Sequence, residues 1–300
     1  MKLGFIGLGT MGLPMMKRLL DYGYEVFVVS RSRGPIEQAL SWGAKEARHP
    51  ADLASKVEIV FTCLPMPDVI EDVYLGVNGI FEGAKPGLIA VDHSTVSPAL
   101  NRLVADALQT KGTQYLDAPI SGGPMGAKAG TLAIMVGGEA EIYERVLPAF
   151  EAMGSNVFYI GPIGSGSVVK LINNMLVGVH TSALSEAFVM GQKANLDPAL
   201  LHQVLKVSTG HSKMIDRCID LIQDRDFKQR FSIDLLYKDM GIAQKLAEEL
   251  NVPIPLGIES TKMIGRAQTQ GFGKEDISAA IKPVESEAGV IVKRREGANE

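Results

Sequence analysis

Residues 2–12 read Lys2-Leu-Gly-Phe-Ile-Gly-Leu-Gly-Thr-Met-Gly12, a short apolar run that passes into the pattern G-x-G-x-x-G. The run Leu13 to Leu20 continues at helical spacing, and Tyr24 to Val29 is predicted as a second strand. Strand, glycine turn, helix and strand thus follow within about 30 residues, the context in which this motif is informative. We predict a βαβ unit here rather than an ordinary tight turn without a ligand.

The spacing of the three glycines predicts a binding site for a dinucleotide. Gly7 permits a tight turn, Gly9 lets the backbone approach a pyrophosphate, and Gly12 lets helix and strand pack closely. Unpaired N–H groups at the start of the helix favour the same anion. The predicted cofactor contacts in this turn are Gly7, Leu8, Gly9, Thr10, Met11 and Gly12.

The end of the second predicted strand indicates which dinucleotide binds. NAD-binding folds usually place Asp or Glu about 20 residues after the motif, where it accepts hydrogen bonds from the ribose. Here the sequence is Val28-Val-Ser-Arg-Ser-Arg33, without a carboxylate. Ser30 and Arg31 suit a 2′-phosphate, and Arg31 can also stack on adenine. We therefore favour NADP over NAD; the alternative is that the arginines are exposed turn residues.

The alternation of strands and helices continues to about residue 160, with about eight strands expected in all. The further predicted strands are residues 57–63, 88–92, 114–117, 132–136 and 157–160, and the predicted helices are 36–42, 69–74, 98–111 and 140–153. Ligands of an open α/β sheet bind at the C-terminal ends of its strands. Leu64-Pro65 and Ser94-Thr95 are therefore expected at the same edge as the glycine turn and Ser30-Arg31.

Two later stretches carry polar groups in unusual settings. In Asp117-Ala-Pro-Ile-Ser-Gly-Gly123, a serine followed by two glycines can hold a carboxylate through its hydroxyl and accessible N–H groups, although by itself the turn is better interpreted as a plain loop. Gly161-Pro-Ile-Gly-Ser-Gly-Ser-Val-Val-Lys170 opens a helix predicted from Gly166 to Ala194. Lys170 and Asn174 share one face of that helix. A lysine that reaches the surface beside a capping asparagine is the alternative.

Helices alone are expected after residue 161, at 199–206, 212–222, 233–250, 256–270 and from 276 onward. The predicted fold is an α/β dinucleotide-binding domain over residues 1–163 and an all-α domain over 164–292, joined by the long helix. Residues 293–300 form a polar tail with the basic run Lys293-Arg-Arg295.

Composition excludes several classes of protein. The chain has 300 residues and a net charge of -4, so no basic surface indicates nucleic acid. Cys63 and Cys218 lie among apolar residues and read as thiols of a reducing cytosol, and the five histidines show no metal-ligand spacing. No apolar run has the length of a membrane span, and the glycine-broken N-terminal run is expected to be a strand rather than a signal peptide. A cytoplasmic protein without a metal is expected.

Four motifs taken together resemble the β-hydroxyacid dehydrogenase family, which includes 3-hydroxyisobutyrate dehydrogenases and tartronate semialdehyde reductases. They are Gly7-x-Gly-x-x-Gly12, Asp117-Ala-Pro-Ile-Ser-Gly-Gly123, Gly161-x-x-Gly-x-Gly-x-x-x-Lys170-x-x-x-Asn174 and Lys238-Asp-Met-Gly-Ile-Ala243. The resemblance covers roughly residues 1–290. It implies a Rossmann-type domain joined by a long helix to an all-α domain, and a homodimer or homotetramer.

The resemblance also implies a role for each matching residue. Lys170 matches the catalytic lysine, Asn174 matches a residue that orients the substrate, and Ser121, Gly122 and Gly123 match the loop that holds its carboxylate. The matching cofactor contacts are the glycine turn, Thr95 and Lys238, and we add Leu64 and Pro65 at the same edge. The implied reaction is NAD(P)-dependent interconversion of a β-hydroxyacid and its semialdehyde, with a small carboxylate or aldehyde as substrate and Lys170 as general acid–base.

Neighbouring branches of the family differ at identifiable positions. The similar 6-phosphogluconate dehydrogenases carry histidine where Asn173 stands, and imine reductases usually lack the lysine, so Lys170 favours carbonyl chemistry. Reduction of an imine or another carbonyl in the same pocket stays as an alternative, as does a dinucleotide-binding module without catalysis. His211 is either a specificity residue or a surface histidine.

Overall fold

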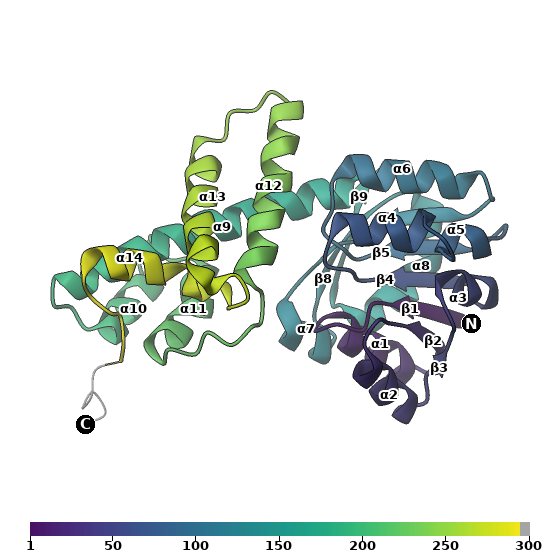
Figure 1. Ribbon diagram of the computed structural model, residues 1–300, viewed down its shortest axis with the longest axis horizontal. Helices are drawn as coiled ribbons and strands as arrows, with labels where there is room; N and C mark the ends of the chain where they lie inside the picture. Colours follow the sequence, from purple (N-terminus) through teal and green to yellow (C-terminus); the bar gives the residue numbers. More distant parts are fainter. Residues whose placement is uncertain (295–300) are drawn as a thin grey trace. The chain divides into compact units, whose positions relative to one another are not determined.

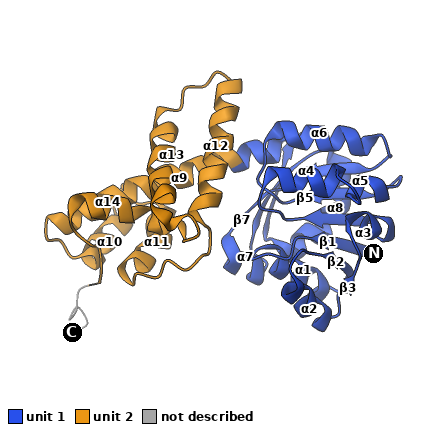
Figure 2. Ribbon diagram, viewed as in Figure 1, with its two compact units in different colours: residues 1–170 blue, residues 171–300 orange. Residues whose placement is uncertain are grey.

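The computed structural model describes residues 1–294, and the chain folds into two compact units. Unit 1 comprises Met1–Lys170, and unit 2 begins at Leu171 (Figure 2). The division falls inside one continuous helix, α9 (Ser165–Lys193), which contributes its first turns to unit 1 and the remainder to unit 2. The α/β fold followed by a helical region is confirmed. Arg295 and the rest of the predicted tail lie outside the described residues.

Unit 1 is built on a nine-stranded sheet in the order β3-β2-β1-β4-β5-β6-β8-β7, with β9 beside β8. Its strands are β1 (Lys2–Ile6), β2 (Glu25–Val29), β3 (Lys45–Glu46), β4 (Ile59–Thr62), β5 (Ile89–Asp92), β6 (Gln114–Asp117), β7 (Ile120–Ser121), β8 (Ala133–Gly137) and β9 (Asn156–Gly161). From β3 to β6 neighbouring strands are parallel, whereas β8 is antiparallel to β6. The strand order reverses between β1 and β4, and this reversal is where such sheets bind ligands at their carboxyl edge.

Helices cover both faces of this sheet (Figure 1). They are α1 (Gly12–Asp21), α2 (Arg33–Ser41), α3 (Pro50–Lys56), α4 (Pro67–Leu75), α5 (Ile80–Gly83), α6 (Pro98–Gln109), α7 (Gly123–Ala129) and α8 (Ala140–Met153). Successive residues of β1 point to opposite faces. Phe5 packs in one core with α1 and α8, while Ile6 packs in the other with α4 and α6. Both faces are apolar because both are covered, as expected for a parallel sheet.

Unit 2 is a helical assembly around its own core. Its elements after α9 are α10 (Pro198–Lys206), α11 (Lys213–Gln223), α12 (Ile233–Glu249), α13 (Pro255–Ala267), a π-helical turn (Gln268–Phe272), a 3₁₀ turn (Ile277–Ala280) and α14 (Ile281–Ala288). Phe188, Ile219 and Met240 bring α9, α11 and α12 together in one buried cluster. The predicted N-cap Asp197 accepts a hydrogen bond from the N–H of Ala199 at 2.9 Å, which satisfies one donor at the start of α10.

Short elements account for the differences from the predicted fold. Local sequence patterns did not predict β3 or β7, which have two residues each, or α3, α5 and α7. The segment read as a glycine loop instead forms β7 and then α7, with Gly122 at the N-cap position.

Among residues 1–294, no helix combines the length and apolar character that crossing a membrane requires. The same residues contain no group of three or more His, Cys, Asp or Glu side chains able to hold a metal ion.

Candidate active site

The glycine turn between β1 and α1 has the shape that a pyrophosphate requires. Gly7 has φ +96°, and a Cβ there would lie 2.4 Å from the Cys63 carbonyl oxygen. A Cβ on Gly12 would lie 1.9 Å from the Gly7 carbonyl oxygen, whereas nothing comes within 4 Å of one built on Gly9. Within residues 1–294, no side chain caps the first turn of α1. The open backbone at Gly9 and the uncapped helix therefore fit a bound dinucleotide phosphate.

The two arginines after β2 have different surroundings. Arg33 Nη1 donates to both carboxylate oxygens of Glu46, at 2.8 and 2.9 Å, and Arg33 also pairs with Glu37. Arg31 is exposed and forms no ion pair with the described residues, and Ser30 beside it is half-buried. Arg31 is thus the arginine of this corner that is available to a phosphate.

A buried carboxylate connects the ends of β4 and β5. Oδ1 of Asp92 accepts hydrogen bonds from Thr62 Oγ1 at 2.7 Å, from Ser94 Oγ at 2.5 Å and from the Ser94 N–H at 3.0 Å. Ser94 Oγ in turn accepts from the N–H of Leu64 at 2.9 Å. These bonds fix the backbone at Leu64 and at Ser94, immediately before Thr95. The predicted cofactor contacts Leu64 and Thr95 therefore both lie in segments whose backbone is held by hydrogen bonds.

His93 is a second buried polar group next to Asp92, and the sequence offered no role for it. Its ring stacks on Phe61 with centroids 5.6 Å apart, and its Nδ1 lies 2.6 Å from the Ala118 carbonyl oxygen. Burial lowers the pKa of His93 to about 4, although the hydrogen bond to Ala118 acts in the opposite direction. The imidazole is therefore neutral at pH 7. Its stacking on Phe61 and its contact with Ala118 hold the ring in place beside Asp92.

The Ser121-Gly122-Gly123 segment joins β7 to α7. Gly122 has φ +138° and Gly123 φ +64°, values that side chains other than glycine rarely adopt. No atom of the described part of the chain lies within 4 Å of a Cβ built on Gly123, so its backbone is open to an approaching group. Exposed main-chain donors beside the Ser121 hydroxyl have the chemistry that a carboxylate requires.

Lys170 stands half-buried in the first turns of α9. Burial and the charge of Asp92 raise the pKa of the Cys63 thiol to about 12, and the Lys170 ammonium acts in the opposite direction. Lys170 therefore lies close enough to the end of β4 to act electrostatically there. In unit 1 the structure brings the glycine turn, Leu64, the Asp92–Ser94 bonds and Lys170 to the same edge.

Asn174 and Lys238 lie in unit 2, where a third residue links them. Asn174 Nδ2 donates to Oδ2 of Asp239 at 2.6 Å, and the Lys238 ammonium lies 2.9 Å from Oδ1 of the same carboxylate. Asn174 Oδ1 accepts from Asn173 Nδ2 at 2.9 Å. Sequence reasoning assigned a role to Lys238 and none to Asp239. A charged pair inside the apolar helix α12 was the signal that could have identified Asp239.

His211 shares a carboxylate partner with His202. Its Nε2 lies 2.9 Å from Asp216 Oδ2, and His202 Nε2 lies 3.1 Å from Oδ1 of the same carboxylate. Hydrogen bonds from His202 and His211 hold the pKa of Asp216 below its usual value. This cluster ties the start of α11 to α10 and to the loop between them.

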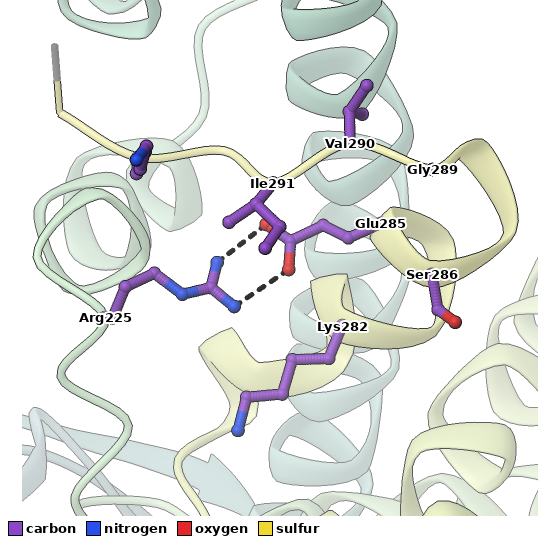
Figure 3. A pocket seen from close by; sticks show the side chains of 8 residues that line it. Arg225, Lys282, Glu285, Ser286, Gly289, Val290 and Ile291 are labelled. Atoms are coloured by element: carbon purple, nitrogen blue, oxygen red, sulfur yellow. Dashed lines mark hydrogen bonds and ion pairs between the residues drawn. The ribbon is translucent and has the colours of Figure 1, made fainter.

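A cavity of about 640 Å³ opens in unit 2 around the Arg225–Glu285 pair (Figure 3). It is lined by Arg225, Lys282, Glu285, Ser286, Gly289, Val290, Ile291 and Lys293. None of the residues predicted for the site lies in this lining. Three of its charged groups are already paired or bound: Arg225 pairs with Glu285, and Lys282 pairs with Glu275 outside the lining.

Comparisons with known proteins relate both parts of the chain to dinucleotide-dependent enzymes. Residues 2–161 match the model for the NAD binding domain of 6-phosphogluconate dehydrogenase. Residues 164–284 match the model described as NAD-binding of NADP-dependent 3-hydroxyisobutyrate dehydrogenase. The two matches cover both units, and each names a dinucleotide.

Individual relatives match over nearly their whole length. The 2-(hydroxymethyl)glutarate dehydrogenase of Eubacterium barkeri is 36% identical, over 97% of each chain. The 2-hydroxy-3-oxopropionate reductase of Escherichia coli is 34% identical, over 95% of this chain and 97% of its own. The crystal structure of 3-hydroxyisobutyrate dehydrogenase from Salmonella typhimurium superposes with a TM-score of 0.87 at 30% identity, over 94% of this chain and 99% of its own.

Two whole-length relatives above 30% identity and a matching cofactor-binding edge lead to one assignment. The chain belongs to the β-hydroxyacid dehydrogenase family, and it is an NAD(P)-dependent oxidoreductase that acts on the hydroxyl group of a small hydroxyacid.

Proposed function

We propose that Lys170 is the general acid–base that interconverts a hydroxyacid of the form HOCH₂–CHR–COO⁻ and its aldehyde, with NADP(H) preferred over NAD(H). The observation that carries this proposal is the place of Lys170 in the first turns of α9, whose start is hydrogen-bonded to Asp117 at the carboxyl end of β6. The Lys170 ammonium also acts electrostatically on Cys63 at the carboxyl end of β4. That end of β4 adjoins the glycine turn, since a Cβ on Gly7 would touch the Cys63 carbonyl. An ammonium at this edge supports a role in proton transfer.

The nicotinamide, when bound, supplies a hydride to the aldehyde carbon or accepts one from the alcohol carbon. During reduction, Lys170 carries a proton on Nζ and donates it to the carbonyl oxygen as that oxygen becomes a hydroxyl. During oxidation, neutral Nζ takes the same proton from the alcohol. Such general acid–base transfer contributes about 10²- to 10⁴-fold to a rate.

The substrate's carboxylate has a separate binding group. The hydroxyl of Ser121 and the N–H groups of Gly122 and Gly123 would hold it, which leaves the hydroxymethyl or aldehyde carbon free to react. Asn174 has one amide hydrogen on Asp239, and its second amide hydrogen would orient the substrate's oxygen. Two fixed ends of a short molecule convert a bimolecular encounter into a pre-positioned reaction.

The substrate class follows from what the relatives' names have in common. The alcohols 2-(hydroxymethyl)glutarate and 3-hydroxyisobutyrate, and the alcohol formed from 2-hydroxy-3-oxopropionate, all contain HOCH₂–CHR–COO⁻. They differ in R, which is a carboxyethyl, a methyl or a hydroxyl group. We propose that this chain recognises the shared part through the segment from Ser121 to Gly123.

A panel of these three alcohols with NADP⁺ and NAD⁺, together with a cyclic imine and NADPH, tests the substrate class. We expect turnover of at least one alcohol and none of its methyl ester, because the ester lacks the anion. Activity confined to the imine would contradict the proposal in favour of C=N reduction. Absence of any turnover with measurable NADPH binding would favour a non-catalytic module.

The role of Lys170 needs its own variant. Lys170→Ala should lower kcat by about 10²-fold or more, with little change in NADPH affinity, because general acid–base catalysis is lost while the glycine turn is intact. Lys193→Ala is a matched control: this lysine stands on the same helix and donates to the Ala288 carbonyl. A near-normal kcat in Lys170→Ala would contradict the proposed role of Lys170 as general acid–base.

A further inference from the structure

We propose that Asp117 is a positioning residue for the reaction: its buried carboxylate holds the first turn of α9 against the sheet and so fixes where Lys170 stands. The proposal rests on the proposed role of Lys170. Asp117 ends β6 and is 1% exposed. Its two carboxylate oxygens accept hydrogen bonds from the residue just before the helix that carries the lysine and from the first turn of that helix.

The carboxylate acts as a helix cap supplied from a distant part of the chain. Oδ1 accepts a hydrogen bond from the N–H of Gly164 at 2.6 Å, and Oδ2 accepts one from the N–H of Ser167 at 2.9 Å. Most N-caps come from the residue just before the helix. Here the cap comes from a strand about 50 residues earlier, so it joins the helix to the sheet as well as satisfying its free N–H groups.

A second set of bonds fixes the same turn from the other side. The Ser167 hydroxyl accepts from Asn101 Nδ2 at 2.7 Å, and Asn101 Oδ1 accepts from the Tyr115 hydroxyl at 2.8 Å. Ser167 is therefore bonded to β6 through its N–H and to α6 through its side chain. Because residues three apart are neighbours on a helix surface, a fixed Ser167 restricts Lys170.

The backbone around Asp117 leaves the helix no space to shift inward. A Cβ on Gly166 would lie 2.2 Å from the Met135 carbonyl oxygen and 3.0 Å from Asp117 Oδ2. A Cβ on Gly137 would lie 2.5 Å from Asp117 Oδ1. Glycine at both positions lets α9 start in direct contact with β6 and β8.

Burying a carboxylate here is unfavourable in free energy unless both of its oxygens accept hydrogen bonds. Burial raises the pKa of Asp117, and the hydrogen bonds from Gly164 and Ser167 oppose that rise. An amide of the same shape has one acceptor oxygen and directs its NH₂ group at a backbone N–H. Asp117→Asn therefore loses one of the two bonds without changing the packing volume. The first turn of α9 then loses one of its two attachments to β6.

The test measures kcat and NADPH dissociation constant separately for Asp117→Asn. We expect kcat to fall about 10- to 100-fold, because misplacing a reacting group by about 1 Å costs up to 10². NADPH affinity should change less than about twofold, since the glycine turn is untouched. Gly166→Ala should also lower kcat with little change in NADPH affinity, because the added methyl group pushes the helix outward while the Asp117 charge is still present. If Asp117→Asn does not fold, Gly166→Ala serves as the test of the proposal.

Asp197→Asn is the matched control, because that carboxylate caps α10 in unit 2. It should leave kcat unchanged. Wild-type kcat in Asp117→Asn, or equal losses of kcat and NADPH affinity, would overturn the proposal. Lys170→Ala measured alongside separates the two hypotheses. An inactive Lys170→Ala with a fully active Asp117→Asn refutes only the positioning role, whereas a fully active Lys170→Ala refutes the proposed function and the positioning role with it.

Discussion

The amide of Asn174 donates to Oδ2 of Asp239 at 2.6 Å, and the two side chains are 2% and 3% exposed. The bond joins α9 to α12 within unit 2 and fixes which way the amide faces. A hydrogen bond to a charged group contributes about 1.5–3 kcal/mol, and the loss of its acceptor leaves a buried donor unsatisfied.

Replacing Asp239 by alanine should therefore lower kcat/KM by about 10- to 100-fold, as the Asn174 amide loses its fixed orientation. Steady-state kinetics with the best substrate of the panel measures this. Gln244→Ala on the same helix removes a comparable amide bond, to Thr261 Oγ1 at 2.8 Å, and should leave kcat/KM close to that of the wild type. Equal losses in both variants would show that α12 is merely destabilised.

The choice between NADP and NAD should depend on Arg31. Arg31→Ala should raise KM for NADPH about 10- to 100-fold while changing KM for NADH little, because a charge-assisted bond to the 2′-phosphate is lost. Initial rates with both cofactors give the ratio.

Arg33→Ala provides the comparison, since its guanidinium already binds Glu46 and Glu37. That variant should leave the NADPH-to-NADH preference unchanged. Two results would contradict the preference for NADP: a wild-type preference for NADH, or an unchanged NADPH-to-NADH ratio in Arg31→Ala. Either would mean that the absence of a carboxylate after β2 does not reflect binding of a 2′-phosphate.

Local patterns predicted the parts of the fold that depend on neighbouring residues. The glycine turn, β6 and the long helix α9 follow from spacing and apolar periodicity, and the structure gives β6 and α8 the predicted bounds. α7 was missed because its sequence, Gly-Pro-Met-Gly-Ala-Lys-Ala, has poor helix propensity and forms a helix only by packing.

Contacts between distant residues were beyond local patterns. Asp117 stood inside a quoted motif, yet nothing near it in sequence showed that it caps α9. The pairing of Asn174 with Asp239 likewise depends on how α9 and α12 pack. For the same reason no role was predicted for His93, because its burial against Phe61 and its contact with the Ala118 carbonyl depend on other strands and loops.

The buried imidazole of His93 should make the protein sensitive to acid. Its pKa is about 4 in the folded chain against an ordinary 6.5. The unfolded chain therefore binds a proton that the folded chain does not, and stability falls as the pH drops from about 6.5 to 4. The full difference corresponds to about 3 kcal/mol.

Urea unfolding at several pH values checks this. His93→Met should lose that part of the slope below pH 6.5, whereas His180→Met at an exposed position should keep it. Other titrating groups, including Asp117, are common to all three proteins and cancel in the comparison. Parallel curves for wild type and His93→Met would contradict the assignment.

Glu285 should be a sensitive charge in unit 2. It is 4% exposed, binds Arg225 through both oxygens at 2.6 and 2.9 Å, and also accepts from the Val292 N–H at 2.8 Å (Figure 3). Removing one partner of a buried pair leaves the other charge uncompensated, at a cost of about 3–5 kcal/mol. Arg225→Met should lower the stability of unit 2 by that amount, measured by denaturant unfolding.

Two further variants separate the buried charge from lost packing. Arg225→Met combined with Glu285→Gln should recover much of the loss, because no unpaired carboxylate is left. Arg294→Ala breaks an exposed pair with Asp224, both side chains being about half exposed, and should cost at most about 1 kcal/mol. If the double variant is no more stable than Arg225→Met, the arginine acts through its packing on Phe227, where its guanidinium carbon lies 4.7 Å from the ring centroid.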